Sequence, residues 1–157
     1  MHFSIVNVSN QEIPLDLLLL ADPSKEMIYR YIEQSEVFVA QEKDQVIGVL
    51  ALKMDENTSE IMNVAVDPGF QKRGVGSKLI RHSIEFAKSS DIQRIIIGTA
   101  DTSKTQLTLY KKLGFSVFER VTNFFAENYP NPIMENGKRA RDMIKLEIKL
   151  TKDSHSF

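Results

Sequence analysis

Residues 60–79, EIMNVAVDPGFQKRGVGSKL, constrain the fold of this chain more than any other stretch. An apolar run of strand character comes first and is ended by Pro68 and Gly69. After the pair Gly74 and Gly76, apolar residues recur at the spacing of one helix face. A glycine loop between a strand and a helix is typical of a site where main-chain amides meet a phosphate, because side chains there would block the approach.

Composition sets limits on the kind of protein. The chain has 157 residues, of which 42% are hydrophobic and 26% are charged, as in an ordinary globular domain. Basic and acidic residues number 20 and 21, so we expect no nucleic-acid partner and no anionic membrane surface as partner. We expect one domain over residues 1–150, followed by a flexible tail over 151–157.

The chain has no cysteine, which excludes disulfides, thiolate metal sites and a cysteinyl intermediate. The N-terminus lacks the pattern of a signal peptide, and the most apolar run, over residues 15–21, is too short to cross a bilayer. A cytoplasmic protein is therefore expected. His2, His82 and His155 show no metal-ligand spacing, so no metal is expected.

The pattern along the chain predicts an α/β fold with a largely antiparallel sheet. Asp22 is expected to cap the second helix, with Pro23 in its first turn. Strands are predicted over 3–8, 37–41, 46–52, 60–66, 94–99, 115–125 and 143–150, and helices over 13–21, 23–34, 74–89 and 103–113.

Two well-known phosphate loops do not fit the glycine pair. A Walker loop needs Lys and then Ser or Thr after its last glycine, whereas Ser77 and Lys78 stand in the reverse order. The dinucleotide fingerprint needs a third glycine where Leu79 stands. A tight turn before a helix, without any phosphate, is the remaining structural alternative.

The pattern that does fit is Gln71, two residues, Gly74, any residue and Gly76. With the strand and proline turn before it, this stretch resembles the pyrophosphate loop of the GNAT superfamily of acetyl-CoA-dependent N-acetyltransferases. LYKKLGF, residues 109–115, is similar to the family's second signature. The resemblance covers residues 60–115 and implies a GNAT fold, a mixed sheet of about seven strands flanked by about four helices.

The resemblance also implies a binding site for acetyl-CoA. Main-chain groups of the strand would pair with the pantetheine arm, and an amide near Val64 would face the thioester oxygen. The loop would hold the pyrophosphate with amides, the helix dipole and nearby cations. The implied cofactor-binding residues are Val64, Ala65, Val66, Gln71, Lys72, Arg73, Gly74, Val75, Gly76, Ser77, Ser103 and Tyr110.

Tyr110 is implied as the general acid, since a phenol with a pKa near 10 suits protonation of a departing thiolate. Alternatively, Tyr110 belongs to an apolar helix stripe with its hydroxyl in water. Glu60 is implied as the general base and is expected to share a strand face with Val64 unless a bulge intervenes. It would lie about 13 Å along the strand from Val64, which calls for a water relay; a solvated glutamate is the alternative.

The acceptor is expected to be an amine of a small molecule or a peptide. Many relatives carry Asn and Ala where Ser103 and Gln106 stand; Ser103 is still expected to cap its helix and reach the pantetheine. The proline-stiffened loop over 129–137 is expected either to shape the acceptor pocket or to pack as a turn or homodimer contact. Phe124, Phe125, Glu127, Tyr129 and Glu135 are the candidate substrate-binding residues.

With no cysteine, direct transfer in a ternary complex is the expected route. A non-catalytic module that binds acyl-CoA as a sensor or subunit is the alternative function.

Overall fold

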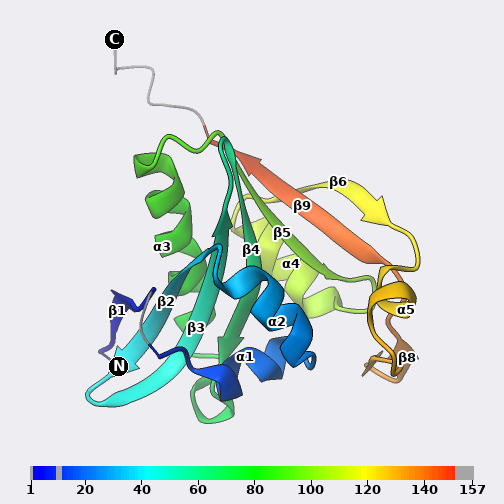
Figure 1. Ribbon diagram of the computed structural model, residues 1–157, viewed down its shortest axis with the longest axis horizontal. Helices are drawn as coiled ribbons and strands as arrows, with labels where there is room; N and C mark the ends of the chain where they lie inside the picture. Colours follow the sequence, from blue (N-terminus) through cyan, green and yellow to red (C-terminus); the bar gives the residue numbers. More distant parts are fainter. Residues whose placement is uncertain (1, 10–11, 151–157) are drawn as a thin grey trace.

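The computed structural model describes residues 2–9 and 12–150, so the tail predicted over 151–157 lies outside the described residues. A seven-stranded sheet runs through the molecule in the order β1-β2-β3-β4-β5-β9-β6 (Figure 1). The only parallel pair in the described sheet is β4 with β5, which confirms the predicted mixed, mostly antiparallel arrangement. The strands are β1 (Ser4–Asn7), β2 (Ser35–Glu42), β3 (Gln45–Met54), β4 (Thr58–Val66), β5 (Arg94–Ala100), β6 (Ser116–Val121) and β9 (Met143–Lys149).

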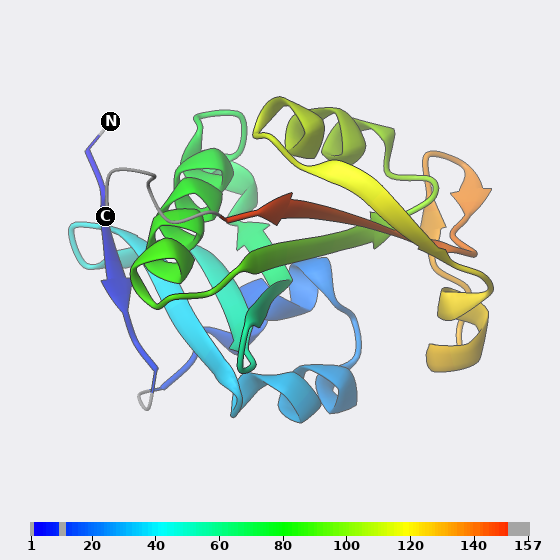
Figure 2. The ribbon, with the colours of Figure 1, turned by 90° about the horizontal axis from the view of Figure 1, so that it is seen from above.

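Helices cover both faces of the sheet. Figure 2 shows α3 and α4 on one face and α1 and α2 on the other. Each pair covers its own apolar core: Leu50, Leu79 and Ile97 belong to the core under α3 and α4, whereas Leu18 and Ile28 belong to the core under α1 and α2. The bounds are α1 (Leu15–Ala21), α2 (Lys25–Ile32), α3 (Val75–Ser89), α4 (Lys104–Lys112) and α5 (Phe124–Asn128).

The start of α2 differs from the prediction. Ser24, not Asp22, is the N-cap residue, and its hydroxyl accepts a hydrogen bond of 3.2 Å from the Met27 amide. Asp22 instead follows the last turn of α1, where its own amide donates to Leu18 O at 3.0 Å. The Asp22 carboxylate is therefore not used as the N-cap of α2.

The strand predicted over 115–125 is too long. Strand β6 ends at Val121, and Asn123 then takes a left-handed conformation with φ of 58°. Its amide donates to Asp142 Oδ1 at 2.9 Å, which fixes the corner from which α5 begins. The following loop contains a small hairpin, β7 (Met134–Glu135) and β8 (Lys138–Arg139), whose turn Asn136–Gly137 has the positive φ angles that this dipeptide favours.

Strands β4 and β5 stay together for only part of their length. Their pairing runs from Thr58 with Arg94 to Ile61 with Ile97, and the strands then diverge (Figure 1). At this point β4 carries a bulge, because Asn63 pairs with Ala51 whereas Ile61 already pairs with Leu52. The extra residue is Met62, and a bulge of this kind bends the strand.

The bulge reverses which side chains share a face of β4. Ile61, Val64 and Val66 all pack toward α3, whereas Ala65 packs toward α1 and α2. Glu60, next to Ile61, is therefore on the face opposite Val64. The expectation that Glu60 and Val64 share one face is wrong, and the intervening bulge is the reason.

Candidate active site

The glycine loop forms the N-terminus of α3. Gly74 is the N-cap residue with φ of 81°, a conformation that strains any residue with a side chain. At Gly76 a Cβ atom would meet Val66 Cγ2 at 3.6 Å, an ordinary contact, so the fold itself does not demand glycine there. The amides of this first turn have no carbonyl one turn earlier in the helix, and with the helix dipole they suit an anion.

A first cavity, the loop cavity, lies between this loop, β4 and α4 and has a volume of about 620 Å³. Lys72 is its one cationic lining residue within the described chain. Arg73 lies outside the lining and places its guanidinium 5.4 Å from the centre of the Phe70 ring. The lining residues are Leu20, Ala21, Val64, Ala65, Val66, Phe70, Gln71, Lys72, Gly74, Val75, Gly76, Ser77, Ile80, Thr105, Gln106, Leu109 and Tyr110.

The main chain of β4 faces the gap left by β5. The Asp67 amide donates to Ile47 O at 2.8 Å, so the neighbouring pair of Val66 with Gly48 is of the non-hydrogen-bonded type. The N–H and C=O groups of Val66 therefore point away from β3, and alternation gives Val64 the same direction. The Val66 carbonyl accepts from Gln71 Nε2 at 3.1 Å, which ties the glycine loop to the strand.

A second cavity, the splay cavity, lies between the diverging ends of β4 and β5 and has a volume of about 290 Å³. Its walls come from the end of α1, from β4, β5 and α4, and from the segment between β6 and β9. The two cavities share Leu20, Ala21, Val64, Gln106 and Tyr110. The splay cavity is also lined by Asp22, Pro23, Ile61, Met62, Asn63, Ile97, Gly98, Thr99, Ala100, Ser103, Phe125, Tyr129, Ile133, Glu135 and Met143.

Tyr110 stands where the two cavities meet. Its side chain is only 6% exposed, and its ring packs against Phe115 with centroids 6.2 Å apart. Burial, and secondarily the negative charge of Glu135, raises the pKa of Tyr110 to about 12. The hydroxyl therefore keeps its proton near neutral pH and can act as a donor.

Glu135 lies beside Tyr110 and is held by the start of α4. Ser103 is the N-cap residue of α4, but its hydroxyl donates to Glu135 Oε1 in a short hydrogen bond instead of capping the helix. The Thr102 hydroxyl donates to the same oxygen at 3.3 Å. The expected side-chain cap by Ser103 is wrong, because its hydroxyl is directed at the Glu135 carboxylate and accepts no hydrogen bond from the first turn of α4.

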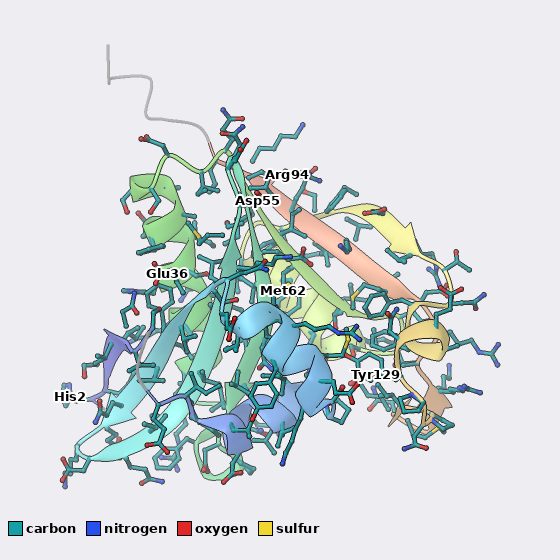
Figure 3. All side chains as sticks on the ribbon, viewed as in Figure 1. His2, Glu36, Asp55, Met62, Arg94 and Tyr129 are labelled. Atoms are coloured by element: carbon teal, nitrogen blue, oxygen red, sulfur yellow. The ribbon has the colours of Figure 1, made fainter. Side chains whose placement is uncertain are left out.

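A buried polar network forms the opposite wall. The Tyr129 hydroxyl donates to Asp22 Oδ1 at 3.0 Å, and the Ser24 amide donates to the same atom at 3.1 Å. Asn63 Nδ2 donates to the Tyr31 hydroxyl at 3.0 Å and to Leu18 O at 2.9 Å. Met62 of β4 and Tyr129, which follows α5, both line the splay cavity and are labelled in Figure 3.

Burial also controls ionisation in this network. It raises the pKa of Asp22 above the ordinary 3.8, and the hydrogen bonds from Ser24, Tyr129 and Tyr31 only partly oppose this rise. Burial raises the pKa of Tyr31 and Tyr129 as well, so both hydroxyls stay protonated at neutral pH.

Several predicted site residues do not reach either cavity. Glu60 is outside both linings, and its carboxylate pairs with Lys145 Nζ at 3.6 Å. Phe124 and Glu127 of α5 are also outside, whereas their neighbours Phe125 and Tyr129 line the splay cavity.

Sequence reasoning missed Asp22 as a site residue. Asn63 also lines the splay cavity, on the face of β4 opposite Val64. Within the described part of the chain, no group of three His, Cys, Asp or Glu side chains is placed to hold a metal. No described helix has both the length and the apolarity needed to span a bilayer.

Comparison with known proteins identifies the family. The model of the acetyltransferase (GNAT) family matches residues 10–115. The chain belongs to the GNAT family. YvbK of Bacillus subtilis (strain 168), an uncharacterised N-acetyltransferase, is a GNAT relative that is 42% identical over 143 residues, covering 90% of this chain and 92% of YvbK.

Two solved structures agree over almost the whole chain. A GNAT acetyltransferase from Elizabethkingia anophelis with acetyl-CoA bound superposes with a TM-score of 0.91 at 42% identity, covering 94% of this chain and 98% of that one. A structure described as IAA acetyltransferase from Bacillus cereus ATCC 14579 superposes with a TM-score of 0.91 at 40% identity, covering 95% of this chain and 100% of that one. The predicted family, fold and enzyme class are thus confirmed: this GNAT protein is an acetyl-CoA-dependent N-acetyltransferase.

Proposed function

We propose that this GNAT enzyme transfers the acetyl group directly from acetyl-CoA to a primary amine while both substrates are bound. The observation that carries the proposal is Tyr110, a buried, protonated hydroxyl placed where the loop cavity meets the splay cavity. A transfer between two sites needs a shared wall of this kind. The sequence has no cysteine that could hold the acetyl group in between.

The loop cavity is proposed to hold the coenzyme. Amides of the first turn of α3, together with Lys72, bind the pyrophosphate, and the outward main-chain groups of Val64 and Val66 pair with the pantetheine arm. The Val64 amide points into the gap between β4 and β5 and is proposed to donate to the thioester oxygen. A fixed amide at that oxygen stabilises the negative charge that develops when the amine attacks.

The reaction then follows from the positions of the chain's own groups. The amine nitrogen forms a bond to the acetyl carbon, the carbon–sulfur bond breaks, and the sulfur receives the Tyr110 proton. Because its pKa is about 12, Tyr110 is a weaker acid than a free thiol, whose pKa is about 8.5, so the tyrosinate left after the transfer takes a proton back from solvent.

Glu60 remains the proposed acceptor of the amine proton. It is on the α1 and α2 side of β4 but outside the splay cavity, so the proton must travel through water. Its carboxylate is paired with Lys145 Nζ at 3.6 Å.

An acceptor screen tests the proposed function. Release of free CoA is followed with acetyl-CoA and a panel of polyamines, aminoglycosides, amino acids and peptides, using wild type and Tyr110→Phe. Turnover with at least one amine, lost in the variant while coenzyme affinity persists, supports the proposal. Coenzyme binding without turnover for any amine would point to an acyl-CoA sensor instead.

Two predictions from the sequence remain proposals. We propose a cytoplasmic location, which cell fractionation tests, and a homodimer, which sedimentation of the full chain tests. Sedimentation as a monomer at micromolar concentration would contradict the proposed homodimer.

A further inference from the structure

The charged side chains that line the splay cavity are all acidic. Two carboxylates, Asp22 and Glu135, line it, and no Lys, Arg or His of the described chain does. The basic side chains of the segment between β6 and β9 lie on a separate groove with no lining residue in common. That groove includes Lys138, Arg139 and Arg141 of this segment, together with Arg120 of β6.

Asn63 adds an acceptor without a partner. Its side chain is 4% exposed, and Oδ1 is the one buried side-chain polar atom of the described residues that lacks a hydrogen-bond partner. The orientation of the amide is fixed, because Leu18 O can only accept and so must face Nδ2. A buried acceptor left unpaired is costly, and an N–H donor of a bound ligand would satisfy it.

The two carboxylates stand on different walls. Asp22 projects from the junction of α1 and α2 and is tied to Tyr129, whereas Glu135 projects from β7 and is tied to Ser103 and Thr102. Glu135 is the one near the reacting end, since its charge acts on Tyr110. Asp22 and Asn63 form the other end, because Tyr31 lies between them.

We propose that the splay cavity selects an acceptor with a second positive charge, namely a short aliphatic diamine. This inference rests on the proposed function and names its substrate class. Glu135 faces the amine that is acetylated. Asp22 and Asn63 Oδ1 bind the second amine, which stays an ammonium group and is not acetylated. A volume of about 290 Å³ suits a small acceptor, because pockets for drug-sized ligands run to about 1,000 Å³.

The same lining disfavours acceptors that carry a carboxylate. Free amino acids would bring a negative charge into a cavity with two carboxylates and no described cation. Monoamines would leave either Asp22, which is buried, or Glu135, which is half-buried, without a cationic partner.

Binding without chemistry gives the first test. The CoA-saturated protein is titrated in a calorimeter with putrescine, n-butylamine and γ-aminobutyrate, which share a four-carbon chain and differ in charge. Putrescine is expected to bind at least about tenfold more tightly than butylamine, the worth of one charge-assisted contact. Equal affinities, or tighter binding of γ-aminobutyrate, would overturn the proposal.

Substitutions show which carboxylates cause the preference for putrescine over butylamine. Asp22→Asn keeps the shape and the acceptor for Tyr129 but removes the charge, and it should lower the ratio of putrescine to butylamine affinity by about tenfold. Glu135→Gln is the second variant, so that a folding defect in either one leaves the other as a test. Glu127→Gln removes a carboxylate from α5 outside the cavity and should keep the wild-type ratio. If Glu127→Gln lowers the ratio as much as the other two, long-range charge explains the preference and the cavity does not.

Steady-state kinetics separates this inference from the proposed function. In the Asp22→Asn variant the loss should appear as a raised KM for putrescine more than as a lowered kcat. If putrescine binds selectively but no amine is acetylated, the selectivity stands and the transfer reaction fails. If putrescine and butylamine are acetylated with equal kcat/KM, the transfer reaction stands and the diamine proposal fails.

Discussion

The Tyr129 hydroxyl donates a hydrogen bond of 3.0 Å to Asp22 Oδ1, joining residues separated by 107 positions in the chain. This contact fastens the segment after α5 to the end of α1. This hydrogen bond therefore joins two walls of the splay cavity.

Replacing Tyr129 by Phe tests how much this pair contributes. We expect the free energy of unfolding to fall by about 1.5 kcal/mol, because a hydrogen bond to a charged, buried carboxylate is lost. Urea denaturation measures the change. Tyr29→Phe is the matched control, since Tyr29 of α2 is 54% exposed, and an equal loss in both variants would contradict the role of the pair.

Replacing Tyr110 by Phe removes the proposed acid and keeps the ring that packs on Phe115. We expect kcat to fall at least about a hundredfold. Affinity for CoA, measured by calorimetry, should stay nearly constant. Because the Tyr110 pKa is about 12, wild-type kcat should show no loss from its deprotonation between about pH 7 and 9. If Tyr110→Phe keeps the wild-type kcat, Tyr110 is not the general acid.

The two loop glycines should respond differently to alanine. Gly74→Ala places a side chain at φ of 81° and should lower stability by about 1–2 kcal/mol. Gly76→Ala meets only an ordinary contact with Val66 within a helix, so stability should hold or rise by about 0.5–1 kcal/mol. CoA affinity of Gly76→Ala should nevertheless fall about tenfold if the pyrophosphate lies against this turn. Unchanged affinity would show that the phosphates bind elsewhere.

Stability should depend on pH through Asp22. Its pKa in the folded protein is raised above the ordinary 3.8, so over the range between these values the folded state binds more protons than the unfolded chain. The contribution of Asp22 to the free energy of unfolding therefore falls as pH rises through that window. Asn cannot titrate, so the stability of Asp22→Asn relative to wild type should increase across the window and then level off.

Urea midpoints at a series of pH values measure that difference. Asp16→Asn, at an exposed position of α1, controls for the loss of net charge. A constant difference between Asp22→Asn and wild type at all pH values would contradict the assignment.

Glu60→Gln tests the proposed base. We expect kcat/KM to fall about tenfold near neutral pH. The deficit should shrink as pH rises, because more of the free amine is already deprotonated. A deficit that is the same at every pH would indicate a structural role in the contact with Lys145.

The sequence predicted the parts of the site that are local in the chain. The loop at Gly74 and the position of Tyr110 follow from short patterns whose members are neighbours along the sequence. The dipeptide Asn136–Gly137 also favours a two-residue hairpin, and the loop expected over 129–137 does contain one.

The rest depended on pairing between distant segments. The bulge at Met62 exists only in the register of β4 against β3, which strand periodicity does not contain. Asn63 meets Leu18 and Tyr31 across separations of 45 and 32 positions. Asp22 looked like an ordinary helix cap because the tyrosine that engages it follows so much later in the chain.

Strand β4 lines both cavities and carries one extra residue, Met62. Val64 and Val66 turn their main chain away from β3, and both line the loop cavity, whereas Asn63 lines the splay cavity. Loss of Met62 would make the pairing of β4 with β3 continuous and would leave Ile61, Asn63 and Val64 on their present faces. What the extra residue contributes is therefore a bend, and it lies directly after Ile61, the last residue of β4 that pairs with β5.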